Sequence, residues 1–383
     1  MDNVRLGIVG LGNMGKAHMA NIRAGKVPGM SVTALCESHG PIPPLQDGET
    51  AFTDVSEMIK SGKIDAILIC TPHFSHTTIG IEALTAGLHV LVEKPISVHK
   101  ADCERLIAAH TDKTKIFAAM FNMRTNATFK KVKDLIDSGE IGAVRRVHWE
   151  VTNWFRTNYY YATGGWRGTW KGEGGGVLMN QCPHNLDLFQ WMFGMPQRIR
   201  GFCQFGRYHE VEVEDNVTAY WEWASGATGV FITSTGEAPG TNRLELCGTR
   251  GRLVLENSRL TFTRNETDML EFSRTAKTGF ARPEVWNVEV PFENTPAQHA
   301  TLTQNFVDAI LDGTPLVAPG ADGMNSVELA NAMLFSSLTG QTIDLPLDGA
   351  AYEQKLQALI AGSRFEKKVV EVQGEDFTKS FVR

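Results

Sequence analysis

Three glycines near the start of the chain constrain its fold more than any other feature of the sequence. The motif Gly10-Leu11-Gly12-Asn13-Met14-Gly15 follows a short apolar run, Val4–Val9, and precedes a helical pattern at 16–24. In this context the first glycine permits a tight turn, the second lets the backbone approach a pyrophosphate, and the third lets the helix pack closely on a sheet. Free N–H groups at the helix N-terminus also attract phosphate. The predicted dinucleotide contacts are Gly10, Gly12, Asn13 and Met14.

The first third of the chain alternates β-rich runs with helical patterns, as βαβ units do. An apolar run at 64–70 is typical of a central parallel strand that is buried on both faces. Helical patterns at 75–87 and 100–110 enclose a further β-rich run at 89–92. We therefore expect residues 1–121 to form a Rossmann domain, which is a doubly wound parallel sheet.

The pattern changes after Met120. An amphipathic helix is predicted at 129–138, and alternating β-rich segments then dominate. We expect residues 122–383 to form a C-terminal α+β domain with a large, mainly antiparallel open sheet, so that the whole chain is an α/β protein of two domains. The expected strands are 146–151, 217–223, 228–235, 243–246, 252–255 and 286–290, and the expected late helices are 305–312 and 326–338.

Composition excludes several classes of protein. The formal net charge of -6, without a basic stripe, argues against a nucleic-acid partner. The six cysteines form no CxxC pair, so we expect neither a metal site nor a disulfide framework. The chain starts directly with an apolar strand, and we find no signal peptide and no transmembrane span. A cytoplasmic location without a membrane partner is therefore expected.

An acidic residue at the end of the second predicted strand, Glu37, indicates which dinucleotide is bound. At this position a carboxylate accepts the ribose hydroxyls of NAD and repels the 2′-phosphate of NADP. The following residues, Ser38-His39-Gly40, include no lysine or arginine that would hold such a phosphate. We expect NAD as the cofactor and regard NADP as less favoured.

Thr71 and Pro72 end the strand predicted at 64–70, where ligands bind in open α/β sheets. We predict that both contact the cofactor, although a simple helix start with Ser75 as the N-cap fits the sequence equally well. His76 is a further candidate contact, and its alternative is a capping or surface role.

Glu93-Lys94-Pro95 ends the next strand, and Glu93 and Lys94 are also predicted cofactor contacts. A lysine beside a nicotinamide ring can bind and polarise a hydroxyl or carbonyl oxygen, and partial burial would lower its pKa. A surface ion pair at a strand end explains Lys94 equally well from the pattern alone.

Several motifs, taken in order, make the chain resemble the Gfo/Idh/MocA oxidoreductase family, which is named for glucose-fructose oxidoreductase and inositol dehydrogenase. The resemblance covers nearly the whole chain, and the combination of Glu-Lys-Pro with a later Gly-Gly-Gly and histidine is its most specific part. The matching motifs are 10–15, Glu37, 71–72, 93–95, 174–178 with Asn180 and His184, 248–251, 305–306 and Pro346.

The resemblance implies that Lys94 and His184 are the catalytic residues around the nicotinamide and the reacting hydroxyl. Asn180 stands where many members of the family have aspartate, so it can bind a substrate hydroxyl but cannot raise the basicity of His184. Asp187 follows His184 on the same helical face and is expected to orient it and to contact substrate. Whether His184 or Lys94 is the base stays open.

Aromatic and basic residues crowd into a long insertion at 154–194. They suit a sugar platform, on which aromatic faces stack against pyranose rings, and they suit a subunit interface or loop core equally well. Arg124 is expected either to reach the cleft or to form a structural salt bridge. The predicted substrate contacts are Asn180, Arg156, Trp166, Asp187 and Tyr160.

These observations predict reversible hydride transfer between NAD(H) and a secondary hydroxyl of a sugar, glycoside or cyclitol. The run at 166–187 is similar to family members that oxidise pyranosides, such as levoglucosan dehydrogenases and glycoside 3-oxidoreductases, which suggests C3 of a pyranoside. Two alternatives are an NAD-dependent glycosidase that oxidises its substrate transiently and a non-catalytic NAD-binding sensor. The open sheet and the resemblance also predict a homo-oligomer, either a dimer or a tetramer.

Overall fold

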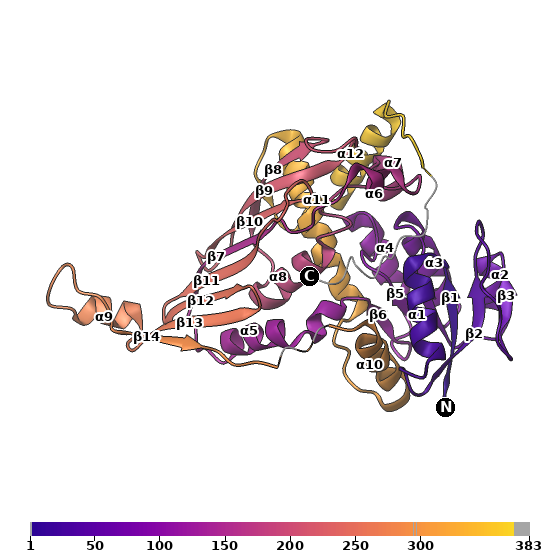
Figure 1. Cartoon of the computed structure of the whole chain (residues 1–383), viewed down its shortest axis with the longest axis horizontal. Coiled ribbons are helices and arrows are strands. Elements are labelled where there is room, and N and C mark those ends of the chain that lie inside the picture. Colours follow the sequence, from indigo (N-terminus) through magenta and orange to yellow (C-terminus); the bar gives the residue numbers. More distant parts are fainter. Residues whose placement is uncertain (1, 294, 296, 371–383) are drawn as a thin grey trace.

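The N-terminal part of the chain folds into a parallel sheet of six strands in the order β3-β2-β1-β4-β5-β6 (Figure 1). The computed structural model describes residues 2–293, 295 and 297–370. The strands are β1 (Val4–Val9), β2 (Met30–Cys36), β3 (Thr50–Phe52), β4 (Ala66–Ile69), β5 (His89–Val92) and β6 (Phe117–Ala119), and the helices are α1 (Asn13–Arg23), α2 (Val55–Lys60), α3 (Phe74–Thr85) and α4 (Lys100–Ala109).

The central strands of this sheet show why the apolar runs of the sequence become parallel strands. All residues of β4 and β5 are buried, because helices cover both faces of the sheet. The predicted Rossmann domain is confirmed. The edge strand β3 and the short helix α2 were not predicted, since each is too short to show a period.

The second part of the chain forms a mixed sheet of nine strands in the order β14-β13-β12-β11-β7-β10-β9-β8-β15. Only β7 and β10 pair in parallel among its described strands, so the expected mainly antiparallel sheet is confirmed. The strands are β7 (Val144–Val151), β8 (Arg198–Phe205), β9 (Glu214–Glu222), β10 (Thr228–Ser234), β11 (Asn242–Gly248), β12 (Gly251–Glu256), β13 (Arg259–Asn265), β14 (Val285–Glu289) and β15 (Ile343–Asp344).

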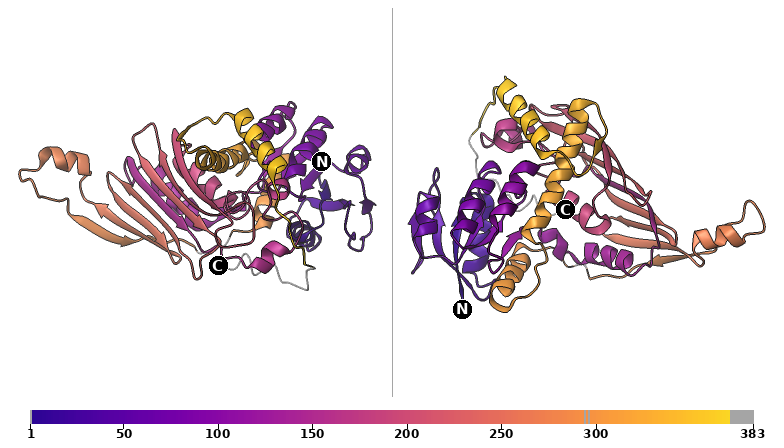
Figure 2. Two further views of the ribbon diagram at one scale, coloured as in Figure 1. Left: turned by 90° about the horizontal axis from the view of Figure 1, so that it is seen from above. Right: turned by 180° about the vertical axis from the view of Figure 1, so that it is seen from behind.

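Helices cover one face of the nine-stranded sheet, and Figure 2 shows them on the same side of it. The core of this face is aromatic, since the rings of Trp149, Trp221 and Phe231 are buried beside Phe189 of the covering helix α8. The helices of this part are α5 (Ala127–Asp137), α6 (Asn158–Ala162), α7 (Trp170–Glu173), α8 (Pro183–Phe193), α9 (Met269–Thr275), α10 (His299–Asp312), α11 (Gly323–Thr339) and α12 (Gly349–Gly362), with 3₁₀ turns η1 (Asn122–Thr125) and η2 (Gly320–Asp322).

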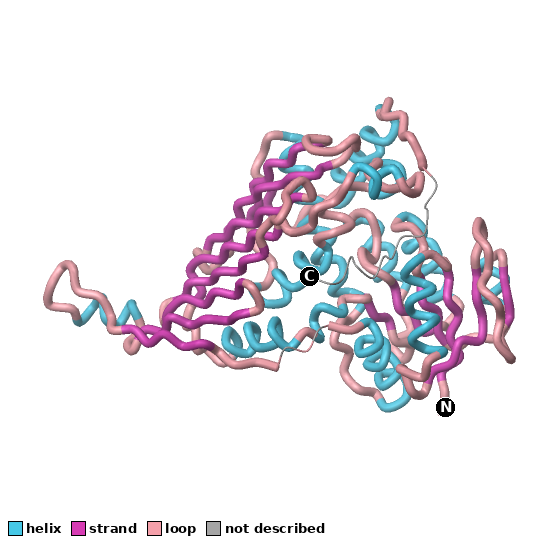
Figure 3. Tube along the Cα trace, in the orientation of Figure 1, coloured by secondary structure: helices cyan, strands magenta, loops and turns pink. Residues whose placement is uncertain are grey.

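Strand β8 was missed by the sequence analysis because a glycine interrupts its pattern. A Cβ at Gly201 would lie 2.4 Å from the carbonyl oxygen of Met333, so glycine is what lets α11 approach the sheet closely. The segment that contains α9 projects from the sheet edge beyond β13 and β14 (Figures 1 and 3). No described helix combines the length and the apolar character that a membrane crossing requires.

Two late helices return to the Rossmann domain. The helix α10 packs against α1, where the rings of His18 and His299 meet edge to face at 5.4 Å, and α12 packs against α4. The predicted domain boundary at residue 121 stays a prediction, because both helices follow it in sequence and pack on helices that precede it.

A buried ion pair fixes the junction between the two sheets. The Arg124 guanidinium, on η1, binds both carboxylate oxygens of Asp187, on α8, at 2.8 and 2.6 Å, and neither side chain is exposed by more than 1%. Arg124 also donates to Asp322 at the end of η2 at 2.9 Å. Of the two roles expected for Arg124, the structure shows the salt bridge.

The replacement Asp187→Ala is expected to lower the free energy of unfolding by about 3 kcal/mol, because it leaves a buried guanidinium without its main partner. Chemical denaturation of both proteins measures this. Asp137→Ala is the matched control, since it breaks the exposed pair with Lys133 at 2.9 Å and should cost less than about 1 kcal/mol. Equal effects of the two replacements would contradict the structural role of the Arg124–Asp187 pair.

Candidate active site

A cleft of about 1370 Å³ opens at the carboxyl ends of the parallel strands and continues to α8 and the aromatic segment. It brings together every predicted cofactor contact and both predicted catalytic residues. Of the predicted substrate contacts, Asp187 alone does not line it. The lining residues that the sequence predicted are Gly10, Gly12, Asn13, Met14, Glu37, Thr71, Pro72, His76, Glu93, Lys94, Arg156, Tyr160, Trp166, Asn180 and His184.

The three glycines of the motif lie in three different environments. A Cβ at Gly10, whose φ is +85°, would lie 2.8 Å from the backbone of Cys70, and a Cβ at Gly15 would lie 2.0 Å from the carbonyl oxygen of Gly10. These two positions therefore need glycine for the turn and for the close helix packing. At Gly12, in contrast, no described atom lies within 4 Å of an added Cβ. No side chain caps the N-terminus of α1. The open space and free N–H groups fit a pyrophosphate.

Glu37 holds its carboxylate at the edge of this space. The backbone N–H of Leu11 donates to Oε2 at 2.8 Å, and the N–H of His39 donates to Oε1 at 3.1 Å. Asp54 also lines this end of the cleft. Among the described lining residues, the lysines and arginines are Lys94, Arg156 and Arg167, all beside Asn180 or the aromatic segment. The carboxylates of Glu37 and Asp54 can accept hydrogen bonds from ribose hydroxyls and would repel a 2′-phosphate.

His76 joins the two strand-end loops. Its Nε2 lies 2.7 Å from the carbonyl oxygen of Thr71, and its Nδ1 lies 2.8 Å from that of Pro95. Because a neutral imidazole has one N–H, the ring donates to one of these two carbonyl oxygens. His76 also lines the cleft, and its contact with the cofactor stays a prediction. The Thr71 hydroxyl is buried and has no hydrogen-bond partner in the described part of the chain, which leaves it available to a ligand.

Lys94 lies at the floor of the cleft, directly after β5. Its Nζ donates a hydrogen bond to the backbone oxygen of Asn180 at 2.9 Å, which links the parallel sheet to the segment before α8. Burial lowers the pKa of Lys94, while the nearby carboxylates of Glu93 and Glu173 act in the opposite direction. Lys94 is therefore a largely buried amine flanked by two carboxylates, and not a surface ion pair.

His184 stands on the first turn of α8 and lines the same cleft. Its ring packs edge to face on Phe121 at 6.0 Å. Burial, with the charge of Lys94, lowers the pKa of His184 to about 3, so the ring is neutral near pH 7. Its Nδ1 is buried and has no hydrogen-bond partner among the described residues, so a ring nitrogen of His184 is available to a ligand.

The predicted role of Asp187 is wrong in this structure. Both oxygens of its carboxylate bind Arg124, and its side chain is fully buried outside the cleft. The spacing of three residues from His184 predicted a shared helical face, but the carboxylate of Asp187 binds the buried guanidinium of Arg124 instead of His184. No carboxylate on α8 therefore orients His184.

Two buried carboxylates lie near Lys94: Glu93, which was predicted as a cofactor contact, and Glu173, which the sequence analysis missed. Glu93 lines the cleft, but its Oε1 lies 2.9 Å from Nε2 of His18. Burial raises its pKa, but His18, together with His299 and Lys94, outweighs burial and lowers the pKa to about 2. Glu173, at the end of α7, accepts a hydrogen bond from the side chain of Asn180. Its position directly before the Gly-Gly-Gly motif was the signal that could have identified it.

The aromatic segment divides between the cleft and the protein core. Tyr160 and Trp166 line the cleft, and the guanidinium of Arg167 lies 4.9 and 4.8 Å from their ring centres. Arg156 lies 5.0 Å from the ring centre of Tyr160. Tyr161, in contrast, is buried. Tyr160 and Trp166 therefore fit the interpretation as a binding platform, and Tyr161 fits the interpretation as a loop core.

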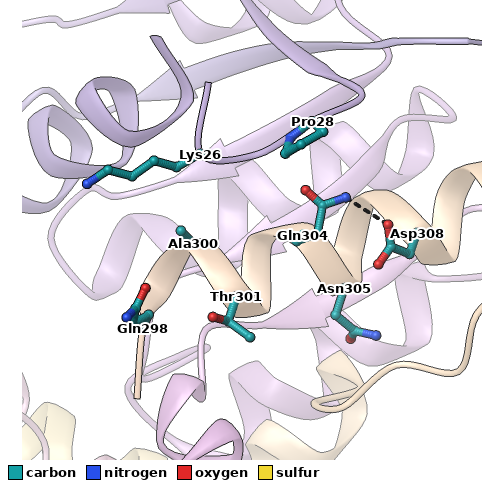
Figure 4. Close-up of a pocket in the computed structure, with 8 residues that line it drawn as sticks. All are labelled: Lys26, Pro28, Gln298, Ala300, Thr301, Gln304, Asn305 and Asp308. Carbon is teal, nitrogen blue, oxygen red and sulfur yellow. Dashed lines mark hydrogen bonds between the residues drawn. The ribbon is translucent and has the colours of Figure 1, made fainter. Parts of the chain in front are cut away.

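A second, open pocket lies between α10 and the loop after α1 (Figure 4). It shares no residue with the cleft, and its side chains are small or polar, with one hydrogen bond drawn between Gln304 and Asp308 at 2.7 Å. We assign it no role in the chemistry of the cleft.

The contrast between Gly12 and Gly15 gives a paired test of the dinucleotide site. Gly15→Ala should lower the melting temperature, because its Cβ would overlap the backbone and cost about 1–3 kcal/mol. Gly12→Ala should leave the melting temperature nearly unchanged and weaken NAD binding, because its Cβ enters only the open space. Thermal unfolding and calorimetric NAD titration measure the two effects. Unchanged NAD affinity in Gly12→Ala would place the pyrophosphate elsewhere.

Comparison with known proteins agrees with this geometry. Residues 4–121 match the family model described as an oxidoreductase family with an NAD-binding Rossmann fold, and residues 129–254 match the GFO/IDH/MocA C-terminal domain. The chain is 25% identical over 272 residues to myo-inositol 2-dehydrogenase of Thermotoga maritima, covering 67% of this chain and 77% of that protein. It is 24% identical over 398 residues to levoglucosan dehydrogenase of Pseudarthrobacter phenanthrenivorans, covering 90% and 99%.

Solved structures show the same fold. The WlbA dehydrogenase of Bordetella pertussis, in complex with NADH and UDP-GlcNAcA, has a TM-score of 0.73 at 24% identity and covers 90% of this chain and 100% of that one. A levoglucosan dehydrogenase with NADH and levoglucosan has a TM-score of 0.72 at 20% identity, with coverage of 90% and 100%. With both family models matched in order and the glycine turn, Glu37 and Lys94 in one cleft, the chain belongs to the Gfo/Idh/MocA family of NAD-binding oxidoreductases.

Proposed function

We propose that this protein oxidises a secondary hydroxyl of a sugar, glycoside or cyclitol with NAD⁺, and catalyses the reverse reduction. The observation that carries the proposal is the meeting of Lys94 Nζ and the neutral ring of His184 in the cleft that contains the dinucleotide-binding turn. The relatives named as myo-inositol 2-dehydrogenase and levoglucosan dehydrogenase support a polyhydroxylated ring as substrate.

The residues of the cleft divide the chemistry between them. NAD⁺, when bound, supplies the acceptor for the hydride that leaves the carbon. The Lys94 ammonium donates a hydrogen bond to the reacting oxygen and stabilises the negative charge that develops there. His184 accepts the hydroxyl proton, so the alcohol loses one hydride and one proton and becomes a carbonyl group.

We assign the base to His184 and not to Lys94. His184 is neutral near pH 7 and has an available nitrogen, whereas Lys94 donates its hydrogen bond to the oxygen of Asn180, and two glutamates beside it oppose the lowering of its pKa by burial. A neutral imidazole can take a proton directly, and a charged ammonium cannot. In the direction of reduction, His184 returns the proton to the new alkoxide.

The substrate is placed against the aromatic segment. We propose that the face of Trp166 or Tyr160 packs on the C–H side of a pyranose ring and that Arg156 and Asn180 bind its hydroxyls. A pyranoside would then be oxidised at C3, a position that the motif at 166–187 suggests. Product analysis by NMR identifies the oxidised carbon.

We further propose that the protein is a homo-oligomer. The nine-stranded sheet has one face covered by helices, and large side chains stand exposed on the other, including Phe202 at 56% and Tyr220 at 41%. Exposed aromatic side chains on an open sheet suit a contact between subunits.

A panel of glucosides, anhydrosugars and inositols with NAD⁺ tests the substrate class. We expect NADH to accumulate with at least one member of the panel, and a ketone product to form in equal amount. Release of an aglycone without NADH would identify a glycosidase that uses NAD⁺ transiently. Binding of NAD⁺ without any turnover across the panel would favour a sensor and contradict the proposal.

Replacement of Lys94 separates binding from chemistry. Lys94→Ala should leave NAD affinity nearly unchanged and reduce kcat by at least ~10²-fold, which is the scale of acid–base and oxyanion groups. The matched control is Lys171→Ala, which removes an exposed lysine of α7 that does not line the cleft. Equal kcat values in the two variants would remove Lys94 from the mechanism.

A further inference from the structure

Glu173 is a buried carboxylate beside the reacting groups to which the mechanism above gives no role. It ends α7, and its side chain is 1% exposed. The N–H of Gly168 donates to its Oε2 at 2.6 Å, and the side-chain amide of Asn180 donates to its Oε1. Both oxygens therefore accept hydrogen bonds, an arrangement that suits an ionised carboxylate.

Asn180 connects this carboxylate to Lys94. The side chain of Asn180 binds Glu173, and its backbone oxygen accepts the hydrogen bond from Lys94 Nζ at 2.9 Å. An ionised Glu173 requires a donor, so Nδ2 of the amide turns toward it and Oδ1 is left for a substrate hydroxyl. A protonated Glu173 would itself be a donor and would favour the opposite orientation of the amide.

The charged and titratable groups around Glu173 come from every element packed on it. Arg167 and Lys367 lower its pKa, while burial raises it to about 7 and dominates. Lys94 is stabilised in its charged form by Glu173. Among the described residues, the groups that interact with Glu173 are Arg167, Lys367, Lys94, His73, Tyr161 and Glu214, and Tyr160 contacts its partner Asn180.

We propose that Glu173 is a positioning residue that supplies, through Asn180, the carboxylate charge that residue 180 itself lacks. Its ionised form keeps Lys94 charged and sets the direction of the Asn180 amide toward substrate. The chain thus has an asparagine in the cleft and a glutamate directly behind it, where one aspartate in the cleft would combine both tasks. The expected effect of Glu173 on kcat rests on the proposed function, but its effect on the pKa of Lys94 can be measured without turnover.

Three variants test the proposal. Glu173→Gln removes the charge and keeps the shape, and the double replacement Glu173→Gln with Asn180→Asp exchanges the amide and the carboxylate within the same hydrogen-bonded pair. Glu214→Gln is the matched control, because Glu214 is also fully buried and accepts from the N–H groups of Gly176 and Leu178, but makes no contact with Asn180.

The first measurement uses the protein without cofactor. The rate at which acetic anhydride acetylates Lys94, followed by mass spectrometry against pH, reports the pKa of Lys94. We expect Glu173→Gln to lower this pKa by roughly 1 unit or more, since an opposite charge nearby is lost. The double variant should restore it, and Glu214→Gln should leave it in place. Infrared spectra of the wild type should show a carboxyl group titrating near pH 7 that Glu173→Gln lacks.

The second measurement is the pH profile of kcat. In the wild type, kcat should fall as the pH falls through about 7, because Glu173 takes up a proton. Glu173→Gln should show no such decline. Its kcat above that pH should be at least tenfold lower, because a shift of one pKa unit in Lys94 corresponds to a tenfold change in its protonation equilibrium. The double variant should regain a pH-dependent decline at lower pH, because residue 180 is less buried than residue 173.

The outcomes distinguish the role of Glu173 from the proposed function. An unchanged acetylation profile of Lys94 in Glu173→Gln overturns the role of Glu173, whatever the enzyme turns over. A shifted profile in a protein that oxidises no carbohydrate supports the role of Glu173 and contradicts the proposed function. Loss of activity in Glu173→Gln that the double variant does not rescue, with a lowered melting temperature in both, would show that Glu173 is merely structural.

Discussion

The hydrogen bond between Lys94 and the backbone of Asn180 joins the two halves of the molecule at the point where the chemistry is expected. Its donor ends a strand of the parallel sheet, and its acceptor precedes the helix that covers the second sheet. An ammonium placed here is partly desolvated, so it must be surrounded by acceptors and negative charge. The carboxylates of Glu93 and Glu173 provide that charge, and each also has a further hydrogen-bond partner, His18 for Glu93 and Asn180 for Glu173.

Much of the fold was readable from the sequence because its signals are local. The glycine turn, the buried apolar run that becomes β4 and the strand-end position of Lys94 each follow from a few adjacent residues and a known period. Strands β8 and β15 and the short helices α6 and α7 were not predicted, because a glycine, short length or irregular composition hides their period. Their positions depend on packing against distant segments, as Gly201 against Met333 illustrates.

The sequence predicted most of the residues that line the candidate site, but not the hydrogen-bond and ion-pair partners of those residues. Motif positions predicted that Lys94, His184 and Asn180 share one cleft, as they do. The pairing of Asp187 with Arg124, 63 residues earlier, has no local signal in the sequence. The approach of both ring nitrogens of His76 to backbone oxygens of Thr71 and Pro95 is not visible in the sequence either. A buried charge needs a partner because its desolvation is costly, and a partner far away in the sequence is visible only in the three-dimensional structure.

The return of α10 to the Rossmann domain has a mechanical consequence. The polypeptide crosses between the two sheets at η1 and again on either side of α10, so they are joined by several connections rather than by one flexible tether. The Arg124 guanidinium binds Asp187 and Asp322 where these connections meet. Such a linkage restrains wide separation of the two sheets, because each connection limits the distance between them. Substrate exchange should then depend on small displacements of the aromatic segment at the mouth of the cleft, while the distance between the dinucleotide turn and the helix of His184 stays nearly constant.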